Sequence, residues 1–223
     1  MIEAVVFDLD GVLLDTEELW DEARRQIAQE RGGRWKPDAQ RAMMGMSSPE
    51  WSRYMHDVIG VPDSPERISE EVVERLAELY RRELPLVDGA IEAVRRIGAR
   101  WPLGIASSSN RPLIDLFLEL TRTRELFRAT VSSEEVARGK PAPDVYLEAA
   151  RRLQVEPERC AAIEDSENGI RSAAAAGMYV AAIPNRAFPP GEEARSLADV
   201  MLDSVAELTP EAIERASPAR RRD

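Results

Sequence analysis

Four short groups of polar residues, each at or just after an apolar run, could perform chemistry in this chain of 223 residues. Asp8 lies inside one such run, VVFDLD, and Asp10 follows two residues later; Glu164 and Asp165 end another, CAAIED. Buried carboxylates are costly without a partner, and several at one place repel each other unless a hard cation lies among them. We therefore expect these acids to surround a Mg²⁺ ion. Glu164 is either a direct ligand or a residue that orients its neighbours.

The other two groups supply the contacts that a phosphate needs. Lys140 would be the compensating positive charge, and the hydroxyl of Ser107, with the backbone N–H groups beside it, could hold phosphate oxygens. Gly11 lets the chain turn sharply, which would place Asp10 beside a leaving oxygen. Asp8 could then attack phosphorus, while Asp10 acts first as general acid and later as general base. The combination indicates phosphoryl transfer.

Short apolar runs must position these groups. The runs do not alternate between apolar and polar residues, which is typical of parallel strands buried on both faces. Segments of helical composition follow most of them. The runs are 4–9, 103–107, 129–132, 161–164 and 180–183, and the helical segments are 111–121, 143–153 and 168–176. The pattern predicts an α/β fold with a doubly wound parallel sheet, in which ligands bind beyond the carboxyl ends of the strands.

The interval between the first two runs is too long for a single crossover. Roughly 90 residues separate them, whereas a parallel crossover needs only about a dozen. Helical spacing at 17–31, 49–59 and 65–84 predicts an all-helical insertion. We place the α/β core at residues 1–15 and 87–223 and the inserted domain at 16–86. We also expect Asp88 to cap a helix that runs to Ile97, and residues 217–223 to form a frayed tail.

The composition limits the partners. A formal net charge of −11 would repel nucleic acid and anionic membranes, so neither is expected, and an anionic substrate would need a local positive pocket. No run approaches the roughly 18 apolar residues that span a bilayer, and the N-terminus lacks a basic signal region. The single cysteine, Cys160, suits a reducing compartment. We expect a cytoplasmic protein whose partner is a small phosphorylated metabolite. Its oligomeric state does not follow from the sequence.

Four motifs in this order resemble the signature motifs of the haloacid dehalogenase superfamily, in the subgroup with a helical cap inserted after the first motif. They are DLDGVLLD (8–15), IASSS (105–109), GKPAPDVY (139–146) and IEDSENGI (163–170), and the likeness spans nearly the whole chain. The resemblance implies that Asp8 is nucleophile and metal ligand, and that Asp10 is acid/base and binds the metal through its backbone oxygen. Asp165 would complete the metal site with Glu164 nearby, and Ser107 and Lys140 would hold phosphate.

Further residues are expected to contact the substrate from both sides of the site. In the core they follow the first and second apolar runs, and in the insertion they lie on its first helix and in the GMSSPE loop. Trp20 has an alternative, because helical spacing also allows it to pack inside the insertion. The expected contacts are Gly11, Ser108, Ser109 and Asn110 in the core, and Glu17, Trp20, Ser47 and Ser48 in the insertion.

The superfamily contains several activities, and departures from its patterns separate them. Asp10 speaks against a dehalogenase or a phosphonatase, neither of which needs it. The β-phosphoglucomutase branch shares LLDT and EDS, but it typically carries a histidine where Trp20 stands and a cap arginine where Ser48 stands. These losses favour hydrolysis, and DTEELW is similar to the corresponding stretch of bacterial sugar-phosphate phosphatases. The alternatives are a phosphomutase and a non-catalytic phosphate-binding relative.

Overall fold

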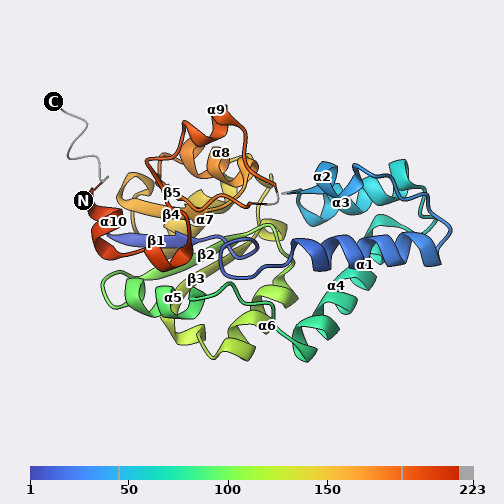
Figure 1. Cartoon of the computed structure of the whole chain (residues 1–223), viewed down its shortest axis with the longest axis horizontal. Coiled ribbons are helices and arrows are strands. Elements are labelled where there is room, and N and C mark those ends of the chain that lie inside the picture. The colour runs from blue at the N-terminus through green and yellow to red at the C-terminus, as the bar shows by residue number, and fades with distance from the viewer. Residues whose placement is uncertain (45, 187, 216–223) are drawn as a thin grey trace.

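The computed structural model describes residues 1–44, 46–186 and 188–215, and it consists of an α/β core and a helical lobe that lie side by side (Figure 1). Among the described residues, the core contains a six-stranded sheet in the order β3-β2-β1-β4-β5-β6, with every neighbouring pair parallel. The doubly wound fold predicted from the sequence is therefore confirmed. The strands are β1 (Ala4–Phe7), β2 (Leu103–Ser107), β3 (Phe127–Ser132), β4 (Cys160–Glu164), β5 (Tyr179–Ala182) and β6 (Val200–Met201).

Helices cover both faces of the sheet, which explains why its strands are apolar throughout. Side chains on a strand alternate between the two faces. On β1, Val5 and Phe7 belong to one buried cluster, while Ala4 and Val6 belong to the other. The first cluster is completed by α5 (Ala90–Gly98), α6 (Arg111–Thr121) and α10 (Pro210–Arg215), and the second by α7 (Asp144–Leu153) and α8 (Glu167–Ala175). The short helix α9 (Glu192–Arg195) contacts α8.

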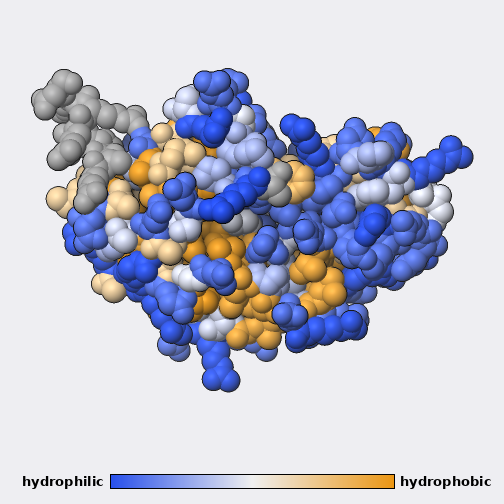
Figure 2. Space-filling view, in the orientation of Figure 1, coloured by the Kyte–Doolittle hydropathy of each residue, from blue (hydrophilic) through white to orange (hydrophobic). Residues whose placement is uncertain are grey.

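The helical lobe is built from amphipathic helices with their apolar faces turned inward. Its longest helix buries residues at helical spacing, among them Val72, Leu76 and Tyr80. The visible outer face of the lobe is mainly hydrophilic (Figure 2). Among the described residues, no helix combines the length and the apolar character needed to cross a bilayer. The helices are α1 (Glu17–Glu30), α2 (Ala39–Met43), α3 (Ser48–Tyr54), which continues as a π-helical turn (Met55–Ile59), and α4 (Pro65–Arg82).

Two chain segments connect the lobe to the core, and they run side by side. The backbone N–H of Asp15 donates to Pro85 O at 2.8 Å, and that of Val87 donates to Leu13 O at 3.1 Å. Leu14 and Leu86 form an antiparallel bridge between these contacts. The chain therefore leaves and re-enters the core at a single narrow connection, next to the carboxyl end of β1.

Several details differ from the sequence-based expectations. The edge strand β6 and the short helices α2, α9 and α10 were not predicted, because two to six residues are too few to show a periodic pattern. Asp88 is not the helix cap: Gly89, with a φ of +79°, precedes the first residue of α5, and this left-handed conformation favours glycine. The predicted tail at 217–223 lies outside the described residues.

Candidate active site

The carboxyl edge of the sheet gathers three acidic side chains and one lysine. β1 and β4 are parallel neighbours, so the residues at their carboxyl ends meet. Ligand atoms of Asp8, Glu164 and Asp165 all lie within 4.8 Å of one another. Lys140 Nζ lies 2.9 Å from Asp8 Oδ1 and 2.6 Å from Glu164 Oε1. All four side chains are buried, so their charges interact without bulk water between them.

The electrostatics of this cluster suit a divalent cation. Burial, and then the charge of Glu164, raises the pKa of Asp8 to about 8, although Lys140 acts in the opposite direction. Burial and the neighbouring carboxylates also raise the pKa of Asp165 well above its usual value. Burial tends to lower the pKa of Lys140, but Asp8 and Glu164 outweigh it and the net shift is upward. One lysine thus faces three carboxylates. A hard cation with oxygen ligands would remove the remaining repulsion.

Glu164 accepts hydrogen bonds from five donors, the weakest of which is the backbone N–H of Ser166 at 3.5 Å. Its Oε1 accepts from Lys140 Nζ and from Tyr146 Oη, each at 2.6 Å. Its Oε2 accepts from the backbone N–H of Asp165 at 3.1 Å and from Ser166 Oγ at 3.3 Å. Both oxygens are therefore engaged by the protein. This pattern favours the second of the two roles considered above, in which Glu164 orients Lys140 and supports the neighbouring ligands.

Two glycines let the carboxylates approach the backbone closely. Gly11 has a φ of +82°, and a Cβ placed on it would lie 2.0 Å from Asp165 Oδ2. A Cβ on Gly169, in the first turn of α8, would lie 1.9 Å from Glu164 Oε2. Gly11 was predicted for its turn and for substrate contact, and the structure adds that it makes room for Asp165. Gly169 was missed, and its place in the ENGI segment was the only available signal.

Asp10 connects the core to the helical lobe. Its Oδ1 accepts hydrogen bonds from Thr16 Oγ1 at 2.5 Å and from Trp20 Nε1 at 3.3 Å. Its Oδ2 accepts from Ser109 Oγ at 2.6 Å and, more weakly, from Ser107 Oγ at 3.5 Å. The first pair comes from the start of the lobe and the second from the loop after β2. The position of Asp10 therefore depends on how the two parts sit together.

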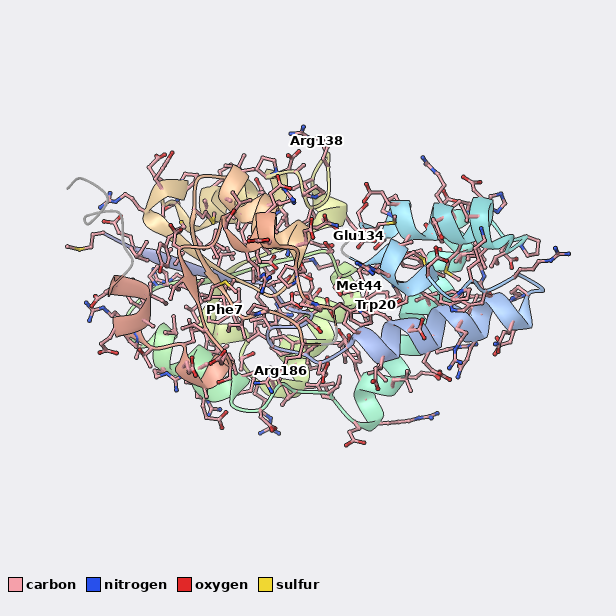
Figure 3. All side chains as sticks on the ribbon, turned by 45° about the horizontal axis from the view of Figure 1, so that its top comes forward. Phe7, Trp20, Met44, Glu134, Arg138 and Arg186 are labelled. Carbon is pink, nitrogen blue, oxygen red and sulfur yellow. The ribbon has the colours of Figure 1, made fainter. Side chains whose placement is uncertain are left out.

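A cavity of about 60 Å³ lies between the sheet edge and the lobe. The labelled side chains of Trp20 and Met44 lie at this junction in Figure 3. The predicted residues Glu17, Trp20, Ser108 and Ser109 line the cavity. Its core side consists of Asp8, Asp10, Ser108, Ser109, Lys140, Asp165 and Ser166, and its lobe side of Glu17, Trp20, Arg24, Met43, Met44, Met46 and Trp51.

Arg24 is a cavity residue that sequence reasoning missed. Its guanidinium lies 4.5 Å from the ring centroid of Trp20 and 4.8 Å from that of Trp51, and the two rings pack edge to face. Burial lowers the pKa of Arg24 to about 10, against the influence of Glu17 and Asp10, so the side chain stays charged at neutral pH. An arginine in a segment rich in Glu and Arg looks like a solvated residue in sequence. Trp20 both packs inside the lobe and faces the cavity.

Besides Gly11 and Glu164, four predicted site residues do not line this cavity. Ser47 caps α3, and its Oγ donates to Glu50 Oε2 at 2.6 Å. Ser107 is fully buried, and its Oγ accepts from the Ser109 N–H at 2.9 Å. Ser48 and Asn110 line a separate cavity between α3, α4 and α6. Direct substrate contact by these four side chains stays a prediction.

Fold and site together define the class of protein, a doubly wound α/β hydrolase with an acidic cluster under a helical lobe. The chain belongs to the haloacid dehalogenase-like hydrolase family, whose model matches residues 2–177. The resemblance recognised in the four motifs is thereby confirmed.

Named relatives cover almost the whole chain. A probable pseudouridine-5′-phosphatase of Drosophila melanogaster is 34% identical over 215 residues, which cover 92% of this chain and 91% of the relative. Hexitol phosphatase B of Escherichia coli K12 is 34% identical over 219 residues, covering 93% and 95%. The crystal structure of CbbY from Rhodobacter sphaeroides in complex with phosphate is 31% identical and has a TM-score of 0.84, with coverage of 96% and 100%.

Replacing Gly169 with alanine tests the packing of the site. In an unobstructed helix this substitution stabilises by roughly 0.5–1 kcal/mol. Here we expect the opposite sign, with a loss of about 1–3 kcal/mol, because the new methyl group would overlap the Glu164 carboxylate. Urea denaturation of the purified variant measures the change. Gly191→Ala is the matched control, since that glycine is exposed and faces only the end of the exposed Glu167. Equal stability of Gly169→Ala and wild type would contradict the described contact.

Proposed function

We propose that the protein is a Mg²⁺-dependent phosphatase that releases inorganic phosphate from a small phosphorylated metabolite, a sugar or polyol phosphate. The observation that carries the proposal is the buried pair of Asp8 and Lys140, at the sheet edge and inside the cavity that also contains Asp10. Membership of the hydrolase family supports it, as do the two relatives named as phosphatases of a phosphorylated nucleoside and of hexitol phosphates.

The chain's own residues provide a complete sequence of bond changes. An oxygen of Asp8 attacks the phosphorus and forms an aspartyl-phosphate, while the bond from phosphorus to the ester oxygen breaks. Asp10 gives a proton to that oxygen and so releases the alcohol. Asp10 then takes a proton from a water molecule that attacks the phosphorus, which frees inorganic phosphate and restores Asp8. Lys140 lies beside the attacking oxygen, where it stabilises negative charge on the phosphoryl group.

The proposed Mg²⁺ ion would be held by the side chains of Asp8 and Asp165 and by the backbone oxygen of Asp10. The crowded and buried carboxylates described above fit this assignment. When bound, the ion supplies Lewis-acid stabilisation of the phosphoryl oxygens. Through its hydrogen bonds to Lys140 and to the backbone of Asp165, Glu164 holds both residues in position.

We further propose that residues 16–86 act as a cap that opens and closes over the site. A cavity of about 60 Å³ has room for only a few water molecules, so a sugar phosphate cannot enter unless the lobe moves away from the core. The paired segments at Leu13–Asp15 and Pro85–Val87 are the natural pivot, because they are the connection between the two parts. When the cap closes, Trp20 and Thr16 donate hydrogen bonds to Asp10. Closure therefore excludes water and positions the acid/base group at the same time.

Replacing Asp8 with asparagine tests the nucleophile. We expect the rate of phosphate release from p-nitrophenyl phosphate to fall by at least about 1,000-fold, because an amide cannot form the aspartyl-phosphate. A colorimetric phosphate assay measures the rate, and circular dichroism checks the fold. The control is Asp57→Asn, which removes an exposed carboxylate of the lobe. Substantial turnover by Asp8→Asn would refute the assignment, and an isomerised sugar phosphate instead of free phosphate would indicate a mutase.

Metal binding can be tested without turnover. Mg²⁺ at about 100 times its Kd adds about 2.7 kcal/mol to the stability of a protein that binds it only when folded. For a chain of this size we expect EDTA-treated protein to gain roughly 5–10 °C in Tm when Mg²⁺ is restored. Asp165→Asn should abolish most of this gain, whereas Glu125→Gln, an exposed control, should retain it. A wild-type Tm that does not respond to Mg²⁺ would contradict the proposed site.

A further inference from the structure

Arg24 is a buried cation that faces the catalytic edge from the opposite wall of the cavity. It comes from α1 of the lobe and is 5% exposed. Asp8, Asp10 and Lys140 line the same cavity from the core. A guanidinium has five N–H donors, and leaving them unpaired in a buried position is costly. The N–H donors of Arg24 therefore require hydrogen-bond acceptors, from the protein or from a ligand.

The protein itself pairs Arg24 poorly. Its one hydrogen bond to a described residue is long, from a terminal nitrogen to Gln40 Oε1 at 3.4 Å, and Nε has no partner among the described residues. Glu17, the nearest candidate for an ion pair, is instead bound by the amide of Gln40, whose Nε2 donates to Glu17 Oε2 at 2.9 Å. Gln40 therefore bridges the two charges, and they do not form a direct pair.

The aromatic contacts hold the guanidinium in place without using its donors. Trp20 and Trp51 lie on it at 4.5 and 4.8 Å, an arrangement that stabilises a cation and restricts its rotation. Trp20 is also fixed by its hydrogen bond to Asp10. The guanidinium of Arg24 is therefore charged, held in one orientation, and left with unused N–H donors. Such a planar group is suited to bind a carboxylate or a phosphate through two parallel hydrogen bonds.

We propose that Arg24 binds a second anionic group of the substrate, at the end of the molecule opposite the phosphate that is hydrolysed. The preferred substrate class is then a phosphorylated sugar acid or a sugar bisphosphate, and not a polyol monophosphate whose phosphate is its one anionic group. This inference rests on the proposed phosphatase function, and it adds the specificity-determining residue. Lys140 and Arg24 would hold the two ends of the substrate in the core and in the lobe.

Pairs of substrates that differ in one group test the preference. 6-Phosphogluconate and sorbitol 6-phosphate differ in a carboxylate against a hydroxymethyl group, and fructose 1,6-bisphosphate and fructose 6-phosphate differ in a second phosphate. We expect kcat/KM of the wild-type enzyme to be at least about tenfold higher for the member of one pair that has two anionic groups, since a hydrogen bond to a charged group is worth that much. The first pair identifies a carboxylate as the second anion, and the second pair a phosphate.

Two substitutions of Arg24 assign the preference to this residue. Arg24→Met keeps a long side chain between the two tryptophans and removes the charge, and Arg24→Lys keeps the charge and removes the fork. We expect Arg24→Met to lower kcat/KM for the substrate with two anionic groups by about tenfold or more relative to its partner with the phosphate alone, and Arg24→Lys to recover part of that ratio. A purely structural role would lower both members of a pair equally. Equal losses, or a wild-type enzyme with no preference in either pair, would overturn the inference.

A binding measurement separates this inference from the proposed function. The Asp8→Asn chain, with and without Arg24→Met, can be titrated calorimetrically with 6-phosphogluconate and with fructose 1,6-bisphosphate. We expect Arg24→Met to weaken binding of one of them about tenfold or more. If the wild type releases phosphate neither from the four compounds nor from p-nitrophenyl phosphate, the proposed function is wrong, while loss of binding in Arg24→Met still supports an anion site at Arg24. Hydrolysis with equal binding by both chains would refute the anion site alone.

Discussion

The structure depends on keeping like charges together at the open edge of a sheet. Asp8 and Asp165 are held close to Glu164 in a buried environment that disfavours their ionised forms, and Lys140 is the cation that lies among them in the described residues. The carboxylates approach the neighbouring backbone closely. Gly11 and Gly169 lie at these points of approach, where any side chain would collide with a carboxylate. A site of this kind is costly for stability, and the proposed binding of a cation and a phosphate would offset that cost.

Asp10 accepts hydrogen bonds from both the core and the helical lobe, so its orientation depends on the position of the lobe. It lies in the core, two residues beyond Asp8, but half of its hydrogen bonds come from Thr16 and Trp20 at the start of the lobe. In the proposed opening, these donors would move with the lobe, and only those from Ser107 and Ser109 would remain. Asp10, the proposed acid/base group, would then be fully oriented only when the cavity is closed to water, which is when proton transfer to the leaving group is useful.

The sequence predicted the strand ends that form the site and three helices of the lobe, but not which side chains of the lobe face the cavity. Asp8, Lys140 and Asp165 were found because buried parallel strands deliver their ends to one edge, a rule that needs no side-chain detail. Arg24, Thr16 and Tyr146 were missed, because helical or loop position alone does not tell which way a side chain faces. Ser48 and Asn110, expected at the substrate, line a different cavity for the same reason. Only the packing of α1 and α3 against the core decides these orientations.

The negative net charge of the molecule makes the buried cations Lys140 and Arg24 important for attracting an anionic substrate. A chain with a net charge of −11 repels an anionic substrate at a distance, and the cavity itself contains carboxylates. Attraction must therefore be local. Lys140 provides positive charge at the carboxyl edge of the sheet, and the proposed bound cation would add further positive charge there. Arg24 is the corresponding charge on the lobe, held between Trp20 and Trp51 at a point where no carboxylate in the described part of the chain pairs with it directly. A substrate with anions at both ends would bring the two walls together, so that selection and closure become the same event.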